Sequence, residues 1–190
     1  FKEAIYGKGH IMSIPSVGTI ETVASITLDD VKAYYESKFS PSISKLVVVG
    51  DVEKDEVLGK LAFLKSWAKK DIQFAEEKPT PAIEKTKIIL VNKPQAPQSE
   101  IRIGYIAMPF DATGDFYKSK LMNFPLGAAF NSRVNLNLRE DKGWTYGARS
   151  GFQGSKFAGA FVAAAGVKAT TTDSSVVEFM KEITNYATNG

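Results

Sequence analysis

The chain has 190 residues, of which 44% are hydrophobic and 24% are charged, and it carries a formal net charge of +3. This length allows one sizeable domain or two small ones, and the composition is ordinary for a globular protein with a buried core. Basic and acidic residues are interspersed, so no basic stripe indicates a nucleic-acid partner. The longest apolar stretches, such as residues 158–167, are far too short to span a membrane.

The chain has no cysteine and a single histidine, His10. Disulfides and thiolate chemistry are therefore excluded. A zinc site normally needs three or four protein ligands that include histidine or cysteine, so we expect no metal or other cofactor in this chain. We expect His10 to be a surface or loop histidine. The lack of cysteine fits a periplasmic or a cytoplasmic location, of which we prefer the bacterial periplasm.

Residues 1–25 show weak periodicity and scattered glycines, which indicates a loop-rich lead-in. The chain begins with Phe1 instead of methionine and ends directly after a helical pattern, so we expect a piece of a longer polypeptide. The first clear helix is predicted to start at Thr27, because Asp30 three residues later completes a capping pair. Helically spaced apolar residues predict that one face of this helix is buried, and Pro41 ends it.

A strand, a helix and a linker are predicted next. The apolar run at residues 45–49 predicts a central strand, and residues 54–68 predict a second helix. Residues 69–85 are rich in charge and proline, which indicates an exposed linker. We therefore divide the chain into a first segment at 1–68, this linker, and a second segment at 86–190.

The second segment begins with two predicted strands, at residues 86–91 and 100–108. They should form a hairpin or lie near each other in one sheet. A helix is predicted at 115–130, and Pro125 should kink it or split it in two.

Two strands and a helix close the second segment. The strands, at 145–152 and 157–167, should pair around a glycine-containing turn. The last helix is amphipathic, with Thr172 or Asp173 as its cap. The tally of about five strands and five helices predicts an α+β fold, in which a mainly antiparallel or mixed sheet has helices packed on one face.

The junction between the helix that starts near Asn131 or Ser132 and the following strand carries the candidate site. Gly143 suits a left-handed exit from that helix. Arg139 in the last turn and Tyr146 at the strand start could project to the same side. A guanidinium and a phenol so placed can donate hydrogen bonds to a peptide carbonyl, or to the oxyanion that forms when water attacks it. Alternatively, the arginine complements its helix C-terminus and the tyrosine packs at a strand edge.

Other catalytic patterns are missing from the sequence. It has no HxxEH or HxxxH pair and no histidine placed for a Ser-His-Asp triad. It has neither GxxxxGK[ST] nor GxGxxG, so phosphate binding is not supported. By itself the chain has no recognisable catalytic machinery.

Four stretches follow one another in a characteristic order. They are the helix and strand at 26–52, PQSEIRIGYIAMP at 97–109, FNSRVNLNLREDKGWTYGARSGF at 130–152 and the final NYATNG. The LRE-x2-G-x2-Y pattern in the third stretch is the most specific. The chain resembles the insulinase/pitrilysin family of zinc metallopeptidases, the inverzincins, and specifically their C-terminal, non-zinc "inactive" domain.

This resemblance implies a role for the candidate pair. Family members place the zinc in a facing domain, on an HxxEH helix that this chain lacks, and the inactive domain supplies an arginine and a tyrosine seven residues apart. These reach toward the bound peptide and help to polarise its scissile carbonyl, and they map onto Arg139 and Tyr146. Pro125 departs from the smoother helix that is usual in the family.

The resemblance also implies partners. We expect a zinc-bearing domain or subunit, fused or separate, and a peptide substrate. An exposed former interface would let the separated fragment form a homo-oligomer. Some homologues use this domain only to hold substrate or to partner a zinc-bearing subunit, so the alternative function is a catalytically inert peptide-binding or assembly subunit that scaffolds a partner.

Overall fold

The structure, a computed structural model, describes residues 1–74 and 79–190. The chain forms two compact units, one made of Phe1–Ile14 with Pro79–Gly190 and the other of Pro15–Lys78. Part of the predicted linker, residues 75–78, lies outside the described residues. No helix in the described part of the chain is long and apolar enough to cross a membrane.

The smaller unit contains short helices, and two of them, α2 (Ile20–Ser25) and α3 (Leu28–Lys38), start at capping boxes. At the start of α3 the Thr27 N–H donates to Asp30 Oδ2 at 2.8 Å, and the Asp30 N–H donates to Thr27 Oγ1 at 3.2 Å, which confirms the predicted capping pair. The predicted second helix breaks after Lys60 into a 3₁₀ turn. The helices of this unit are α2 (Ile20–Ser25), α3 (Leu28–Lys38), α4 (Lys54–Lys60) and η1 (Ala62–Ser66).

Two predictions for this unit are wrong. None of the residues of α3 is buried, so its apolar face is not covered as expected. Residues 45–49 form no strand, and Val47 and Val49 are 81% and 92% exposed. A strand exists only through hydrogen bonds to a neighbouring strand, and none of the described strands pairs with this apolar run.

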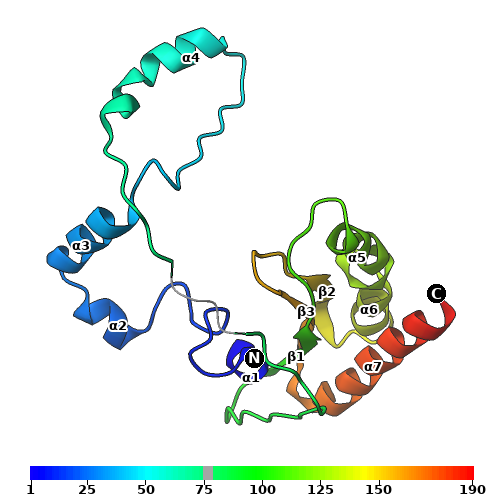
Figure 1. The fold of residues 1–190 in the computed structure, drawn as a ribbon. Coiled ribbons are helices and arrows are strands. Elements are labelled where there is room, and N and C mark those ends of the chain that lie inside the picture. Colours follow the sequence, from blue (N-terminus) through cyan, green and yellow to red (C-terminus); the bar gives the residue numbers. More distant parts are fainter. Residues whose placement is uncertain (75–78) are drawn as a thin grey trace. The chain divides into compact units, whose positions relative to one another are not determined.

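The larger unit contains a three-stranded antiparallel sheet in the order β1-β3-β2. Its strands are β1 (Gln98–Ile106), β2 (Thr145–Phe152) and β3 (Ala160–Lys168) (Figure 1). The predicted pairing of the last two strands is confirmed. The expected strand at 86–91 is not formed, and β1 pairs with β3 instead of with that segment, so the predicted hairpin is wrong. The fold is α+β as expected, with three strands in the described part of the chain instead of about five.

Three helices of the larger unit, α5 (Asp115–Asn123), α6 (Arg133–Asn135) and α7 (Thr172–Asn189), lie together beside this sheet (Figure 1). The helix predicted at 115–130 is interrupted but not separated at Pro125, because α5 ends at Asn123 and continues directly into a π-helical turn that contains this proline. The last helix starts after Thr171, whose side chain makes no capping bond, so neither Thr172 nor Asp173 is its cap. The elements are α1 (Lys2–Tyr6), α5 (Asp115–Asn123), η2 (Phe124–Ala128), α6 (Arg133–Asn135), η3 (Leu136–Asp141), η4 (Ala169–Thr171) and α7 (Thr172–Asn189).

The hydrophobic core lies between these helices and the inner face of the sheet. Val134 and Leu138 enter it from the helix before β2, and Phe179 enters it from α7; each of the three is at most 1% exposed. Ala163 and Ala165 of β3 form its floor. Because these are small, the helices can approach the sheet closely. The core therefore fixes the helix–strand junction that carries Arg139 and Tyr146.

His10 lies in a loop but is buried, with only 4% of its surface exposed. Its ring stacks on Tyr6 at a centroid distance of 5.3 Å, and its Nδ1 accepts a hydrogen bond from the Met12 N–H at 3.1 Å. The expectation of a surface position is therefore wrong. The stacking partner belongs to α1, where the sequence predicted only a loop.

Candidate functional site

The helix–strand junction has the geometry that its glycine predicts. Gly143 has φ +63°, and its N–H donates to the Arg139 carbonyl at 3.1 Å. The Trp144 N–H donates to the Leu138 carbonyl at 3.0 Å. These bonds satisfy helix-end carbonyls and direct the chain into β2. Ser132 occupies the N-cap position, but its hydroxyl makes no capping bond, so that part of the prediction is wrong.

Tyr146 projects into solvent at the edge of a hollow. Its side chain is 91% exposed, although it belongs to a strand that borders the core. The hollow has a volume of about 360 Å³ and is lined by residues 128–130, Asn135 and residues 146–149. We call it the Tyr146 hollow. The alternative interpretation, in which Tyr146 packs at a strand edge, does not fit this exposure, and the phenol is accessible to a ligand.

Arg139 lies behind one wall of this hollow. Its guanidinium carbon is 4.4 Å from the centroid of the Phe130 ring, a cation–π contact, and Phe130 itself lines the hollow. Nη1 of Arg139 lies 3.3 Å from Oε1 of Glu140, an ion-pair distance. This Nη1 is buried and makes no hydrogen bond within the described residues. The arginine thus retains unused donor capacity.

Phe130, which no pattern in the sequence singles out, connects the two predicted site residues: it lines the hollow together with Tyr146, and its ring stacks on Arg139. Tyr146 borders the hollow directly, whereas Arg139 contacts it through the ring that forms its wall. When a guanidinium stacks by its face on an aromatic ring, its N–H groups still point outward in the guanidinium plane. There they can donate hydrogen bonds to a group beside the ring. One exposed phenol and one stacked guanidinium near the same shallow hollow have the donors to bind a carbonyl or carboxylate oxygen.

Two buried asparagines bind β2 to the neighbouring helices, and one of them, Asn135, also lines the hollow. Asn135 donates to the Phe130 carbonyl at 2.6 Å and accepts from the Ala148 N–H at 3.0 Å. Asn123 donates to the Ser150 carbonyl at 2.8 Å. Both side chains bind backbone groups of β2, and Asn135 also binds the Phe130 carbonyl. They thus provide β2 with hydrogen bonds that a further strand would otherwise supply. Sequence reasoning missed them, although polar residues at otherwise buried helical positions are a usable signal.

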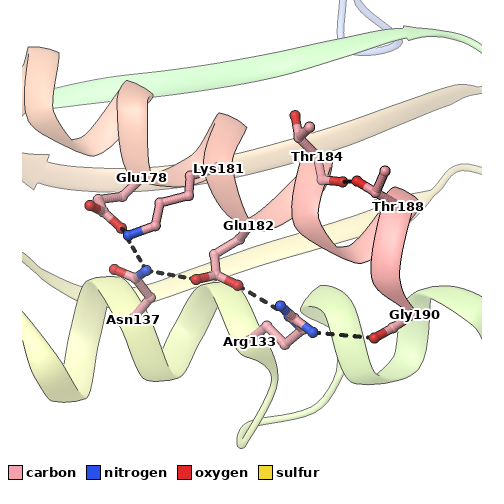
Figure 2. Close-up of polar contacts among 8 residues, drawn as sticks. All are labelled: Arg133, Asn137, Glu178, Lys181, Glu182, Thr184, Thr188 and Gly190. Carbon is pink, nitrogen blue, oxygen red and sulfur yellow. Dashed lines mark hydrogen bonds and ion pairs between the residues drawn. The ribbon is translucent and has the colours of Figure 1, made fainter.

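The helix that carries Arg139 is also tied to α7 by polar contacts (Figure 2). Arg133 Nε lies 3.1 Å from Glu182 Oε2. The Asn137 amide donates to Glu178 and to Glu182, both at 2.8 Å. Figure 2 shows these side chains facing one another between the two helices. The network positions η3, and with it Arg139, against the rest of the unit.

This network predicts a pH-dependent contribution to stability. The hydrogen bond from Asn137, followed by the charge of Lys181, lowers the pKa of Glu178 below its ordinary value of 4.5. A lowered folded-state pKa stabilises the protein above that ordinary value, and the stabilisation disappears as the pH falls through the lowered pKa. Glu178→Gln should therefore be less stable than the parent chain at pH 7, by about 1 kcal/mol or less, because the network is only partly buried. The difference should be smaller at pH 3. Urea unfolding at both pH values measures it, and an equal difference at both would contradict it.

The family comparison agrees with this architecture. The family described as the peptidase M16 inactive domain matches residues 25–190. The chain belongs to this family. The match confirms the resemblance to the inactive domain of insulinase-type metallopeptidases that the LRE-x2-G-x2-Y pattern indicated.

Relatives of this M16 domain carry two kinds of name. The "Uncharacterized zinc protease YmxG" of Bacillus subtilis is 27% identical over 144 residues, which are 76% of this chain and 34% of that protein. The "Non-peptidase homolog YmxG" of Helicobacter pylori is 30% identical over 136 residues, 69% of this chain and 30% of that protein. The chain thus spans about a third of the length of these relatives.

A solved structure shares the fold of this M16 domain. The peptidase M16 inactive domain from Pseudomonas fluorescens matches with a TM-score of 0.86 at 24% identity, over 100% of this chain and 45% of that chain. A protease from Helicobacter pylori matches with a TM-score of 0.74 at 20% identity, over 88% of this chain and 42% of that chain.

The side chains of this M16 domain do not fit a zinc ion. The sequence offers one histidine and no cysteine. Within residues 1–74 and 79–190, no group of three or more His, Cys, Asp or Glu side chains could hold a metal. The one histidine is buried against Tyr6, with its Nδ1 occupied by a backbone N–H. Zinc ligands of a metallopeptidase would therefore have to come from outside this chain.

Proposed function

We propose that this chain is the substrate-facing inactive domain of a zinc metalloendopeptidase of the insulinase/pitrilysin family. In this role Arg139 and Tyr146 bind the peptide and polarise its scissile carbonyl opposite a zinc-bearing domain or subunit. The observation that carries the proposal is the exposed Tyr146 phenol at a hollow that is also lined by Phe130, whose ring stacks on the Arg139 guanidinium. A structural tyrosine would be expected to bury its ring.

The two side chains have the right chemistry for this task. A phenol O–H and a guanidinium N–H both donate hydrogen bonds, and both can follow a carbonyl oxygen as negative charge develops on it. The Phe130 ring restricts the guanidinium to one plane, so little of its motion has to be lost when a peptide binds. The Glu140 carboxylate neutralises part of its charge and would be the group that a substrate oxygen displaces or joins.

The partner supplies what this chain lacks. We expect it to bring the metal ligands and the metal, which activates the attacking water. It is either fused to this chain or a separate subunit, and the name of the Bacillus subtilis relative, a zinc protease, supports its presence. Self-association of the separated chain stays a prediction, based on the apolar side chains that the described part of the chain leaves exposed.

One observation favours a second function. The Helicobacter pylori relative is named a non-peptidase homolog, and Arg139 has a local ion-pair partner in Glu140. In that case the chain is a catalytically inert peptide-binding or assembly subunit that scaffolds a partner. The Tyr146 hollow would then hold a peptide without contributing to its cleavage.

Reconstitution separates the two functions. Peptide hydrolysis and zinc content are measured on this chain alone, on the zinc-bearing half of its parent alone, and on their mixture. The peptidase function predicts no zinc and no hydrolysis for this chain alone, and hydrolysis in the mixture well above that of the zinc-bearing half. Binding of peptide without any gain in hydrolysis would support the inert subunit. Stoichiometric zinc in the isolated chain would contradict both.

A further inference from the structure

A local irregularity of β2 decides where the Tyr146 side chain points. The register pairs Thr145 with Val167 and Ala148 with Ala165, so β2 advances three residues while β3 advances two. One extra residue on one strand of an antiparallel pair is a β-bulge, a feature that redirects side chains and is frequent beside active sites.

The bulge is what brings the phenol out of the core. Successive side chains of a regular strand alternate between its faces, so Tyr146 would share the face of Ala148 and Ser150. Those two side chains are buried, at 0% and 6% exposed, whereas Tyr146 is 91% exposed. Without the extra residue a regular β2 would direct the phenol into the core. The exposed position of Tyr146 therefore depends on the bulge.

The hydroxyl of Thr145 fills this bulge. It lies 2.8 Å from the Gly166 carbonyl on β3 and 3.0 Å from the Gly147 carbonyl, and it accepts the Gly147 N–H at 3.1 Å. A hydroxyl has one hydrogen to donate and two lone pairs to accept with, so the shorter contact to Gly166 is the stronger candidate for its donated bond. One side chain thus supplies the bulged backbone with a hydrogen-bond partner and joins it to the neighbouring strand.

We propose that Thr145 is a positioning residue that holds the bulge and so directs the Tyr146 phenol toward the bound peptide. This proposal rests on the proposed function. It adds the Thr145 hydroxyl as the group that orients the Tyr146 phenol, one of the two hydrogen-bond donors. Thr145 itself does not line the Tyr146 hollow and touches no reacting atom. It acts through the backbone of residues 145–147.

Two substitutions at this position form a matched pair. Thr145→Val keeps the shape and the β-branch but removes the hydroxyl, whereas Thr145→Ser keeps the hydroxyl and removes the methyl group. In the assembled peptidase, Thr145→Val should lower kcat about tenfold or more, because small misplacements of a catalytic donor have effects of that size. KM should change little. Thr145→Ser should retain most of the turnover.

A second background shows whether the effect passes through Tyr146. When Tyr146 is already Phe, Thr145→Val should cause no further loss of kcat, because the donor that it positions is gone. A merely structural role would lower turnover in both backgrounds. Equal losses in the Val and Ser variants, an unchanged kcat in the Val variant, or a further loss in the Phe background would each overturn the proposal.

Hydrogen exchange tests the bulge independently of catalysis. The Gly147 amide, measured by NMR in the same assembled protein, should exchange faster in Thr145→Val and at the parent rate in Thr145→Ser. If Tyr146→Phe leaves kcat unchanged, the proposed function fails, but this exchange comparison still reports on the hydroxyl. An unchanged Gly147 exchange rate in Thr145→Val would overturn the positioning role even where the proposed function holds.

Discussion

Tyr146→Phe in the assembled peptidase is expected to lower kcat by about 10²- to 10³-fold, the usual effect of removing one donor to a developing oxyanion. The substitution removes only the phenol oxygen. Because the side chain is 91% exposed, the hydroxyl contributes little to folding, and the free energy of unfolding should stay within about 0.5 kcal/mol of the parent value. Steady-state peptide hydrolysis and denaturant unfolding, measured on the same preparation, check both parts.

A matched control comes from α5. Tyr117 is 50% exposed and does not line the Tyr146 hollow. Tyr117→Phe removes the same atom from a surface tyrosine and should leave kcat unchanged. If both variants keep the parent kcat, Tyr146 donates nothing to the transition state, and the inert-subunit function becomes the better account.

The largest expected effect on stability is at Leu138, one residue before Arg139. Its side chain is 1% exposed and lies in the core with Val134 and Phe179. Leu138→Ala would leave a cavity there and should lower the free energy of unfolding by about 2–5 kcal/mol. That is a large part of the total for a domain of this size, so the variant should show a clearly lower urea midpoint.

Leu136 in the same helical turn supplies the comparison. It is 43% exposed, so Leu136→Ala removes the same atoms from a position that buries far fewer of them. Its cost should stay below about 1 kcal/mol. Equal urea midpoints for the two variants would mean that Leu138 does not anchor this helix. The claim that the core fixes the position of Arg139 would then be wrong as well.

Two local features were predicted correctly from the sequence because local chemistry controls them. A glycine after the last helical turn predicts a left-handed exit, and Gly143 has one. Thr27 with Asp30 predicts a capped helix start, and both hydrogen bonds are present. Each of these depends on residues within a few positions of one another.

Features set by distant parts of the chain could not be predicted in the same way. An apolar run such as 86–91 indicates that a segment favours burial, but it does not indicate which strand the segment pairs with. The strand that pairs with β1 is β3, some sixty residues further along, with Ala165 opposite Ile101. His10 is buried because Tyr6 of an unforeseen helix stacks on it. The bulge at Thr145 depends on register against β3, which no pattern within β2 contains.

The sequence could not predict whether Arg139 and Tyr146 are exposed, and this exposure is what distinguishes the substrate-facing domain from the inert subunit. The structure gives a divided answer: Tyr146 is exposed at a hollow, while Arg139 is partly buried and paired with Glu140. The division arises because the guanidinium stacks on Phe130, nine residues earlier, in a contact that helical periodicity does not indicate. The tyrosine therefore supports a substrate-facing role more strongly than the arginine does.

Turnover of peptide by the zinc-bearing half, saturated with either the parent chain or its Arg139→Ala variant, tests the central claim most directly. Formation of the complex is verified for both by size-exclusion chromatography, so that loss of assembly is not mistaken for loss of catalysis. The account predicts that the parent chain raises kcat strongly and that the Arg139→Ala chain assembles equally well but loses most of that gain. Equal turnover with both chains would contradict the claim that this domain supplies hydrogen-bond donors to the reaction.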